Sequence, residues 1–179
     1  IYNYYALSTV DHELSEKVFV HEFGHSFAGL ADEYYTSAVA YNEFYPPGVE
    51  PAEPNITALL NPEQVKWEEL LEPGIGVPTD WHKSEIESLQ TEASRLSAEM
   101  RHSSGGNDEM KEKVSSIRRS IDSLKQEFRG KVGVYEGAGY ASEGLYRSEI
   151  ECLMFSNSEN RFCRVCRQAI ERMILFYTK

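Results

Sequence analysis

The residues best suited to chemistry lie in the short segment His21-Glu22-Phe23-Gly24-His25, which follows the pattern His-Glu-x-x-His. In a helix, two histidines four positions apart lie on one face, so both imidazoles can reach one tetrahedral ion at about 2.0–2.1 Å. Glu22 projects beside them, where it can take a proton from a metal-bound water. Because zinc lowers the pKa of such a water toward about 7, attack on a carbonyl becomes feasible near neutral pH. The pattern therefore predicts a zinc site with His21 and His25 as ligands and Glu22 as the general base.

A third protein ligand is expected just beyond the helix, because catalytic zinc takes three protein ligands and keeps one position open for water. Gly29 can end the helix in the left-handed conformation. Asp32 is then the first carboxylate able to face back toward the ion, and it is the predicted third ligand. Glu33 is expected to point away and to support the site by bonding a histidine N–H. Two alternatives for the third ligand stay open, namely Glu33 itself and a more distant carboxylate such as Glu43.

Four stretches of the chain must hold these residues in place. Residues 13–30 are predicted to form the helix that carries the histidines, and residues 164–178 a closing helix. Residues 34–80 contain the prolines of the chain, which predicts a long irregular segment. Residues 131–147 are rich in Gly and Tyr and are expected to form a surface loop. The expected inward faces consist of Val20, Phe23, Phe27 and Leu30 in the first helix and Val165, Ala169, Met173 and Phe176 in the last.

The middle of the chain, residues 83–130, differs from its flanks. It contains nine Lys and Arg and nine Asp and Glu, so the flanks carry the whole net charge of −11. Apolar residues recur at spacings of three and four on either side of a polar turn at 103–108, which predicts two antiparallel helices joined through a narrow seam. The seam consists of Ile86, Leu89, Ala93, Leu96 and Met100, followed by Met110, Val114, Ile117, Ile121, Leu124 and Phe128. We therefore predict one domain, residues 1–82 and 131–179, interrupted by a helical hairpin. The hairpin is either an ordinary solvent-covered excursion or a docking arm for a partner.

Composition narrows the remaining function classes. The 179 residues are 41% hydrophobic and 12% aromatic, which excludes disorder as the main state. The net charge of −11 argues against nucleic acid as the partner. No apolar run approaches the roughly 18 residues of a transmembrane helix, so no membrane span is expected. The chain begins at Ile1 without an initiator Met, which suggests a missing N-terminal portion of the same protein.

Beyond its metal-binding pattern, the sequence resembles a known family. HEFGHSFAGLADEYY is similar to the zinc helix of the IgA-peptidase family of bacterial metallopeptidases, a group placed with the metzincins. The resemblance continues through KVGVYEGAGYASEGLYR and CLMFSN…FCRVCRQAIERMI, so it covers most of residues 11–80 and 131–179 but not the hairpin. It implies an α+β, metzincin-like zinc peptidase catalytic domain that is mostly helical in this fragment. It also implies a protein that is secreted or held at the bacterial cell surface or in the periplasm.

The resemblance adds one site residue and raises one doubt. Met154 matches the methionine turn that underlies the metal in metzincins. The usual metzincin spacing, however, would place a Gly and the third ligand at Ala28 and Ala31, which can do neither job. Gly29 and Asp32 each come one residue late, so the third ligand is the assignment that the comparison supports least.

Tyrosines of the Gly-rich segment are further candidates for the site. A Tyr hydroxyl near zinc can donate a hydrogen bond to a developing oxyanion. Tyr140 and Tyr146 are the candidates for this role, and Tyr135 lies in the same segment. An ordinary loop tyrosine that packs its ring and exposes its hydroxyl is the competing interpretation.

The three cysteines allow more than one chemistry. Cys163-x-x-Cys166 is typical of a redox pair or of half a zinc site. A second Cys-x-x-Cys pair that would complete a structural zinc site is absent from the sequence. We therefore expect a disulfide from Cys152 to one of the pair if the compartment is oxidising.

Two hypotheses of different class follow. The first is a zinc endopeptidase that hydrolyses peptide bonds in protein or peptide substrates, with immunoglobulin or other host and extracellular proteins as candidates. The alternative is a catalytically idle, zinc-containing binding module whose hairpin engages a protein partner. Glu22 favours the enzyme, because an idle descendant has no need of a base beside its metal.

Overall fold

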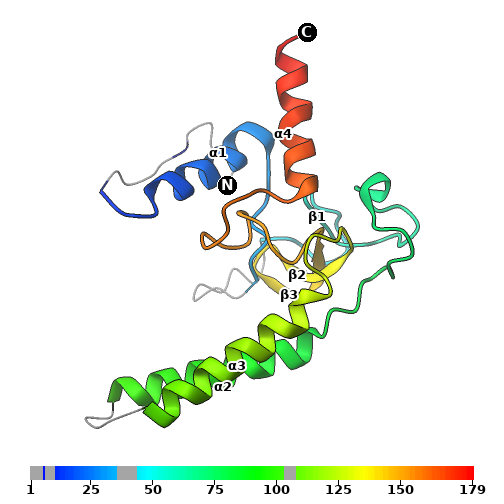
Figure 1. Ribbon diagram of the computed structural model, residues 1–179. Helices are drawn as coiled ribbons and strands as arrows, with labels where there is room; N and C mark the ends of the chain where they lie inside the picture. Colours follow the sequence, from blue (N-terminus) through cyan, green and yellow to red (C-terminus); the bar gives the residue numbers. More distant parts are fainter. Residues whose placement is uncertain (1–5, 7–10, 36–43, 103–107) are drawn as a thin grey trace. The chain divides into compact units, whose positions relative to one another are not determined.

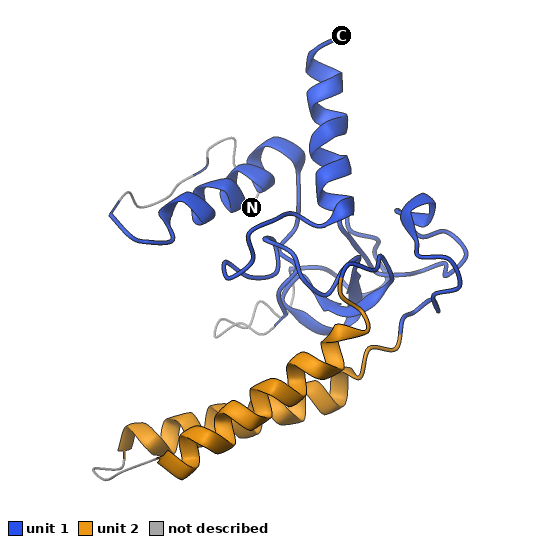
Figure 2. Ribbon diagram, in the orientation of Figure 1, with its two compact units in different colours: residues 1–79, 130–179 blue, residues 80–129 orange. Residues whose placement is uncertain are grey.

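The chain divides into two compact units, one formed by residues 1–79 and 130–179 and the other by residues 80–129 (Figure 2). The structure is a computed structural model that describes residue 6 and residues 11–35, 44–102 and 108–179. In these described ranges, no helix combines the length and the apolar character that crossing a membrane requires.

The first unit combines helices with a small antiparallel sheet, an α+β architecture (Figure 1). Its elements are α1 (Ser15–Ala28), β1 (Ile56–Thr57), the 3₁₀ helix η1 (Glu68–Leu70), β2 (Tyr135–Ala138), β3 (Ala141–Arg147) and α4 (Arg164–Tyr177). The strand order is β1-β3-β2, with Ile56 opposite Arg147 and Arg147 opposite Tyr135. The sheet therefore joins the Pro-rich segment to the Gly-rich segment that follows the second unit.

The Gly-rich segment is not the surface loop that its composition suggested. Residues 135–147 form the hairpin β2–β3, whose two-residue tip, Gly139-Tyr140, has positive φ angles of 56° and 68°. Two positive φ angles in succession match the twist of a tight β-hairpin turn. Gly137 sits at an irregularity in the ladder with φ 103°, where a Cβ would lie 2.6 Å from the ring of Tyr35. The glycines thus permit a hairpin turn and a close contact with the ring of Tyr35. Because they occupy positions within the strands, the segment lacks the alternating apolar pattern from which a strand is predicted.

The inward face predicted for the first helix is wrong. The buried residues of α1 are His21 and Gly24, whereas Val20 and Phe23 are 40% and 41% exposed. Leu30 is buried, but it comes after the helix has ended at Ala28. The helix therefore turns its histidine face inward and leaves part of its apolar surface to solvent.

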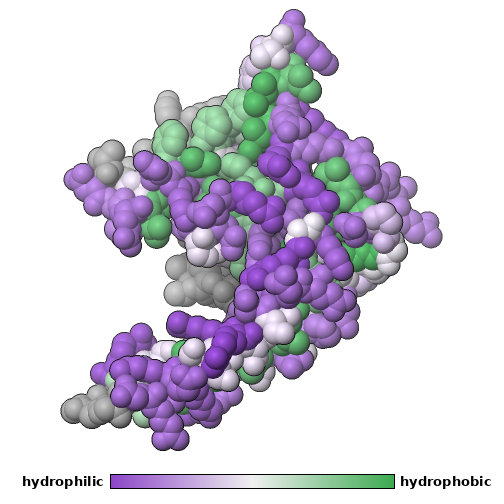
Figure 3. Space-filling view, viewed as in Figure 1, coloured by the Kyte–Doolittle hydropathy of each residue, from purple (hydrophilic) through white to green (hydrophobic). Residues whose placement is uncertain are grey.

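The last helix also buries fewer residues than its pattern predicts. Val165, Cys166 and Ala169 are buried at its start, while Phe176 is 70% exposed near its end. A tilted ring contact joins α1 to the last turns of α4, with centroids of Phe27 and Tyr177 6.3 Å apart. Apolar side chains gather on the surface along these two helices (Figure 3).

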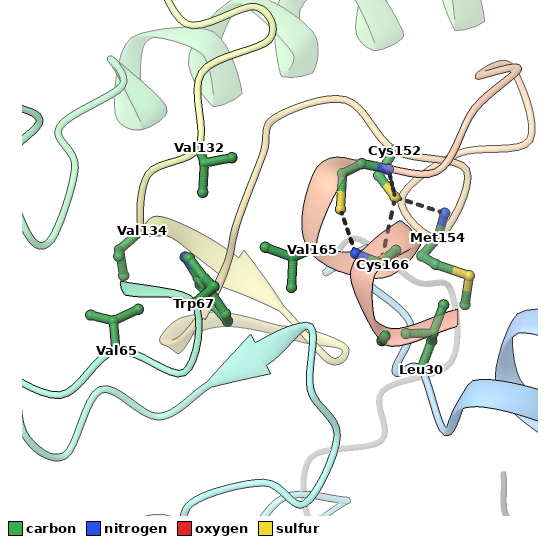
Figure 4. Close-up of a cluster of buried hydrophobic side chains, with 11 residues drawn as sticks. Leu30, Val65, Trp67, Val132, Val134, Cys152, Met154, Val165 and Cys166 are labelled. Carbon is green, nitrogen blue, oxygen red and sulfur yellow. Dashed lines mark hydrogen bonds between the residues drawn. The ribbon is translucent and has the colours of Figure 1, made fainter. Parts of the chain in front are cut away.

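The core of the first unit is assembled from segments that lie far apart in the sequence. Its buried members are Leu30, Val65, Trp67, Val132, Val134, Cys152, Met154, Cys163, Val165, Cys166 and Ala169. Figure 4 shows Trp67 near Val65 and Val134, and Cys152 with Met154 and Cys166 in another part of the cluster. The indole N–H of Trp67 donates to the carbonyl of Gly133 at 2.8 Å. This bond fixes the Pro-rich segment against the chain that leads into β2.

The second unit contains α2 (Lys83–His102) and α3 (Asp108–Gln126). Their predicted apolar seams pack together, with Leu96, Val114 and Ile117 buried at the centre. Lys113 Nζ and Glu92 lie 2.9 Å apart and pair the two helices at their surface. Residues 103–107 of the predicted turn lie outside the described residues.

We expect residues 80–129 to be dispensable for folding of the first unit. The two segments that flank residues 80–129 are hydrogen-bonded to each other. Thr79 N donates to Val134 O at 2.8 Å, and Val134 N donates to Thr79 Oγ1 at 2.9 Å. A linker of about six Gly and Ser residues spans up to about 20 Å. Replacing residues 80–129 with such a linker should leave a soluble unit that unfolds cooperatively, as measured by thermal melting and near-UV circular dichroism. An insoluble or non-cooperative product would show that the hairpin belongs to the core.

Candidate metal centre

The two histidines of the metal-binding pattern face each other across one helical turn. Their Nε2 atoms are 3.1 Å apart, and the rings meet edge to face with centroids 4.7 Å apart. Gly29 ends α1 with φ 61° and donates its N–H to His25 O at 3.1 Å. This left-handed cap, which the sequence predicts, is the position where glycine avoids the Cβ penalty. The chain therefore leaves the helix directly after its last histidine turn.

The segment after the cap is held on two sides by backbone hydrogen bonds. Gly139 N and Tyr140 N, at the tip of the β2–β3 hairpin, donate to Asp32 O and Tyr34 O at 3.0 Å each. Glu33 N donates to the carbonyl of Met154 at 2.9 Å. The backbone of residues 32–34 thus lies between the hairpin tip and the turn around Met154, with little freedom to shift.

A buried asparagine fixes the same segment from a third direction. The side chain of Asn55 accepts from Ala31 N at 2.8 Å and donates to Ala31 O at 2.9 Å. It also donates to Glu33 Oε1 at 3.0 Å. Because Asn55 is fully buried next to β1, each of these bonds would leave a costly unpaired group if it were lost.

Asp32, the predicted third ligand, lies beside the two histidines. Its Oδ1 atom lies 3.0 Å from His21 Nε2 and 3.3 Å from His25 Nε2. Together with the distance of 3.1 Å between the two nitrogens, these values outline a triangle of three electron-pair donors. In a tetrahedral zinc site with ligand bonds of about 2.0–2.1 Å, ligand atoms are separated by about 3.3–3.4 Å. The triangle therefore has the size of one face of such a site.

Backbone carbonyls set the protonation of both imidazoles. His21 Nδ1 lies 3.0 Å from Leu153 O, and His25 Nδ1 lies 2.6 Å from Leu30 O. A carbonyl only accepts hydrogen bonds, so each Nδ1 carries the hydrogen and donates it. In the neutral imidazole the Nε2 lone pair is then free for a metal. Both Nε2 atoms and Asp32 Oδ1 lie within 3.0–3.3 Å of one another, an arrangement that suits a cation.

The charges around the triangle show the same preference. Burial opposes ionisation of Asp32, but hydrogen bonds from His21, His25 and Tyr140 outweigh it and hold the pKa of this carboxyl well below its usual range. Burial also opposes a charge on His21, yet its bonds to Asp32 and to Leu153 O raise its pKa above the ordinary value. The ionised Asp32 and the carbonyl of Leu153 thus make the surroundings of His21 electronegative, which favours a cation there.

Tyr140 is the candidate tyrosine that the structure brings to this triangle. Its hydroxyl donates to Asp32 Oδ2, and it accepts from the hydroxyl of Tyr34 at 3.3 Å. Tyr146, the other candidate, is half-buried in β3, and among the described residues it makes no hydrogen bond to the histidines or to Asp32. Tyr135 instead donates its hydroxyl to Lys131 O at 3.1 Å.

Glu22 lies at the edge of the same group. One carboxylate oxygen of Glu22 and one nitrogen of each histidine lie within 4.8 Å of one another. Unlike Asp32, the Glu22 side chain is only partly buried, so it is open to solvent and to an approaching substrate. The alternative ligand Glu43 lies outside the described residues.

Met154 lies in a turn beneath the helix that carries the histidines. Phe155 N and Ser156 N both donate to Cys152 O, at 2.9 and 3.0 Å, and close the turn around it. Met154 is fully buried. A Cβ on Gly24 would lie 3.2 Å from the sulfur of Met154 and equally close to side-chain atoms of Leu30 and Phe162. Gly24 therefore lets the helix approach the methionine turn closely enough for His21 to reach Leu153 O.

Glu33 does not have the supporting role predicted for it. It is fully buried, and among the described residues it makes no hydrogen bond to a histidine. The supporting positions at the histidines are occupied by the carbonyls of Leu153 and Leu30. Glu33 Oε1 instead lies against Cys166 Sγ at 3.2 Å, and burial raises the pKa of this carboxyl well above its ordinary value.

The cysteines are free in the structure, so the predicted disulfide from Cys152 is not formed. Cys152 Sγ and Cys166 Sγ lie 3.8 Å apart. All three thiols are buried in the core beside the methionine turn.

Several residues that contribute to the site were not predicted from the sequence. Asn55 is not part of any recognisable sequence motif with the other site residues. The carbonyls of Leu30 and Leu153 are backbone groups, which any residue type supplies. The sequence pointed to these carbonyls only indirectly. Leu30 lies in the segment after the histidine helix and Leu153 in the methionine turn, and both segments were already expected to contribute to the site.

Comparison with known proteins identifies the family of the chain. A search among curated proteins finds no match for the chain. A family model described as IgA Peptidase M64 matches residues 1–174. The chain therefore belongs to the IgA peptidase M64 family, metallopeptidases that act on protein or peptide substrates.

Proposed function

We propose that this chain is the catalytic part of a zinc-dependent endopeptidase with a metzincin-like fold. The observation that carries the proposal is the convergence of His21 Nε2, His25 Nε2 and Asp32 Oδ1 within 3.0–3.3 Å of one another. Two imidazoles and one carboxylate with a fourth position left for water are the donor set of a catalytic zinc site. Such mixed nitrogen and oxygen ligands suit zinc better than the hard cations Mg²⁺ and Ca²⁺, which take oxygen ligands.

Zinc at this position would lower the pKa of a bound water toward about 7 and polarise the scissile carbonyl. The protein's own contribution begins with Glu22, whose partly buried carboxylate stands beside the histidines. Glu22 accepts a proton from the water as it attacks the carbonyl carbon, and it then delivers that proton to the leaving amine nitrogen as the C–N bond breaks. The proton is thus transferred within the site, and the peptide is cleaved to a carboxylate and an amine.

Tyr140 fixes the orientation of the proposed third ligand, Asp32. The hydroxyl of Tyr140 occupies Asp32 Oδ2, which leaves Oδ1 as the oxygen that faces the histidines. This bond orients the carboxylate and makes Tyr140 a positioning residue. A shift of its hydroxyl from Asp32 to the substrate would let it donate to the developing oxyanion.

The family relationship supports a protein or peptide as substrate. Within that class, immunoglobulin or another host or extracellular protein is the proposed target, and secretion or attachment to the bacterial surface or periplasm the proposed location. The alternative of an idle zinc-containing binding module is weakened by Glu22, which is retained next to the histidines without being one of the three converging donors.

Glu22→Gln should abolish most of the activity without loss of metal. The amide keeps the shape of the side chain but cannot accept the proton, so the rate should fall by about 10²–10⁴-fold or more. Cleavage of a generic protein substrate and elemental analysis of the purified protein measure the two effects. Glu16→Gln, on the first turn of the same helix, is the matched control and should retain activity. Loss of zinc together with activity in Glu22→Gln would mean that Glu22 binds the metal.

Asp32→Asn should remove one equivalent of zinc from the chain, and His25→Ala should do the same. The amide keeps the volume and one acceptor oxygen but loses the negative charge that both histidines face. Zinc content and a competition titration with a chelator would measure the loss, with Glu22→Gln as the variant that keeps its metal. Full retention of zinc in Asp32→Asn would move the third ligand elsewhere, and Glu43 would be the next residue to test.

Tyr140→Phe should weaken zinc binding by about 10–100-fold, the range for partners that orient a metal ligand. The ring remains, while the bond to Asp32 Oδ2 is lost. Tyr146→Phe removes the same hydroxyl from a residue that makes no bond to the triangle and should leave zinc affinity unchanged. Tyr140 has two possible roles, which are to orient Asp32 and to donate a hydrogen bond to the oxyanion. Kinetics at saturating zinc distinguish them, because a lower kcat under these conditions would show that Tyr140 also stabilises the oxyanion. Unchanged zinc affinity in Tyr140→Phe would contradict the positioning role.

A further inference from the structure

A second cluster of metal-binding side chains lies in the core, apart from the histidine triangle. It consists of Glu33, Cys152, Cys163 and Cys166, all four buried. One ligand atom from each lies within 4.8 Å of all the others. The residues come from three places in the fold, namely the segment after α1, the methionine turn and the start of α4.

The separations within this cluster have the scale of a tetrahedral site. Cys152 Sγ and Cys166 Sγ are 3.8 Å apart, and Glu33 Oε1 lies 3.2 Å from Cys166 Sγ and 3.7 Å from Cys163 Sγ. With zinc bonds of about 2.3 Å to sulfur and about 2.0–2.2 Å to oxygen, tetrahedral ligands are separated by about 3.5–3.8 Å. A metal ion at the centre would therefore require only small movements of these side chains.

We propose that Glu33, Cys152, Cys163 and Cys166 form a closed, structural zinc site. Three thiolates and a carboxylate suit zinc, which binds sulfur and oxygen ligands in tetrahedral sites. Four protein ligands leave no position for water or substrate, and burial of all four side chains excludes solvent. The role of this ion is therefore structural, and it is separate from the histidine site.

Backbone N–H groups donate to the sulfurs of Cys152 and Cys163. Cys152 Sγ accepts from Cys163 N at 3.2 Å and from Met154 N at 3.4 Å, the latter drawn in Figure 4. Cys163 is the N-cap of α4, and its sulfur accepts from Cys166 N at 3.4 Å. These N–H groups supply hydrogen bonds that a metal-bound thiolate can accept.

The carboxylate of Glu33 is also prepared for a cation. The amide of Asn55 donates to Glu33 Oε1 at 3.0 Å and fixes its orientation, as partners of metal ligands do. Glu33 Oε2 is buried without a hydrogen bond among the described residues. The buried guanidinium of Arg147 interacts electrostatically with Glu33. This positive charge offsets part of the negative charge that four anionic ligands leave around a divalent ion.

A disulfide between Cys152 and Cys166 is the competing outcome. It would need the two sulfurs to close from 3.8 Å to about 2.05 Å. It would also leave Cys163 and Glu33 side by side in the core without an ion to hold them. Zinc accounts for all four residues, and a disulfide accounts for two.

The test is the metal content of the full chain, purified with zinc present and without chelators. We expect about two zinc ions per chain, one bound by nitrogen and oxygen and one by sulfur. X-ray absorption at the zinc edge should show zinc–sulfur bonds of about 2.3 Å, and cobalt substitution should show thiolate-to-cobalt charge-transfer absorption. All three thiols should be released for titration after denaturation with a chelator. One zinc without sulfur ligands, iron or copper at the thiolates, or a Cys152–Cys166 disulfide would each overturn the proposal.

A pair of neighbouring variants separates this site from the histidine site. Glu33→Gln should weaken the sulfur-bound metal by more than the roughly 10–100-fold expected for an outer partner, and should leave the histidine site loaded. Asp32→Asn should do the reverse and keep the thiolate-to-cobalt absorption. Cys163→Ser should abolish that absorption. If this variant does not fold, the X-ray absorption of the unmodified chain still tests for zinc–sulfur bonds. Failure of the peptidase proposal would leave the sulfur signal intact, so the two proposals fail independently.

Discussion

The structure depends on one short segment, Ala31 to Glu33, whose backbone is held by hydrogen bonds from three directions. The tip of the β2–β3 hairpin, the methionine turn and the side chain of Asn55 each hydrogen-bond to it. Asp32 contacts the two histidines, and its neighbour Glu33 contacts Cys163 and Cys166. One short segment therefore contributes to two clusters at once.

In this arrangement the two proposed metal sites share neighbouring supports, although each binds its ion through its own ligands. The thiolate site would tie together Glu33, the methionine turn through Cys152, and α4 through Cys163 and Cys166. The same methionine turn supplies the carbonyl of Leu153 that orients His21. A structural ion in the core would therefore fix two of the supports of the catalytic site without touching substrate. In an oxidising compartment the same thiols are also open to disulfide formation, so zinc must be bound before oxidation for this support to exist.

The sequence predicts those features that short-range spacing determines. Two histidines one turn apart, a glycine at the helix end and a seam of spacings three and four each act within a few residues, and the structure contains the helix, its left-handed cap and the packed helical pair. The third donor, Asp32, follows from the same local reasoning, because few residues separate it from the cap. Glu33 shows the limit of this reasoning, because its partner Cys166 lies 133 positions away.

Other sequence-based predictions were wrong or missing for the same reason, which is that the decisive contacts join residues far apart in the sequence. The apolar residues of α1 suggested an inward face, but the polar imidazoles take the buried side because carbonyls and a carboxylate are there to bond them. The β2–β3 hairpin is built from glycines that permit close contacts, so it has no alternating apolar pattern to reveal it. Asn55 acts on the site only through the fold, and nothing local distinguishes it from an ordinary polar residue.

The backbone conformation of Tyr140 affects which residues evolution can favour at this position. A side chain with φ 68° sits in a conformation that costs an ordinary L-residue about 1–2 kcal/mol, a cost that Gly and Asn largely avoid. The fold accepts this cost at a position from which a hydroxyl donates to Asp32. Selection for heat resistance alone would favour Gly or Asn there, while selection for a firmly held metal ligand would favour Tyr. Thermal stability and metal retention should therefore pull this hairpin tip in opposite directions, and the residue found there records which of them prevailed.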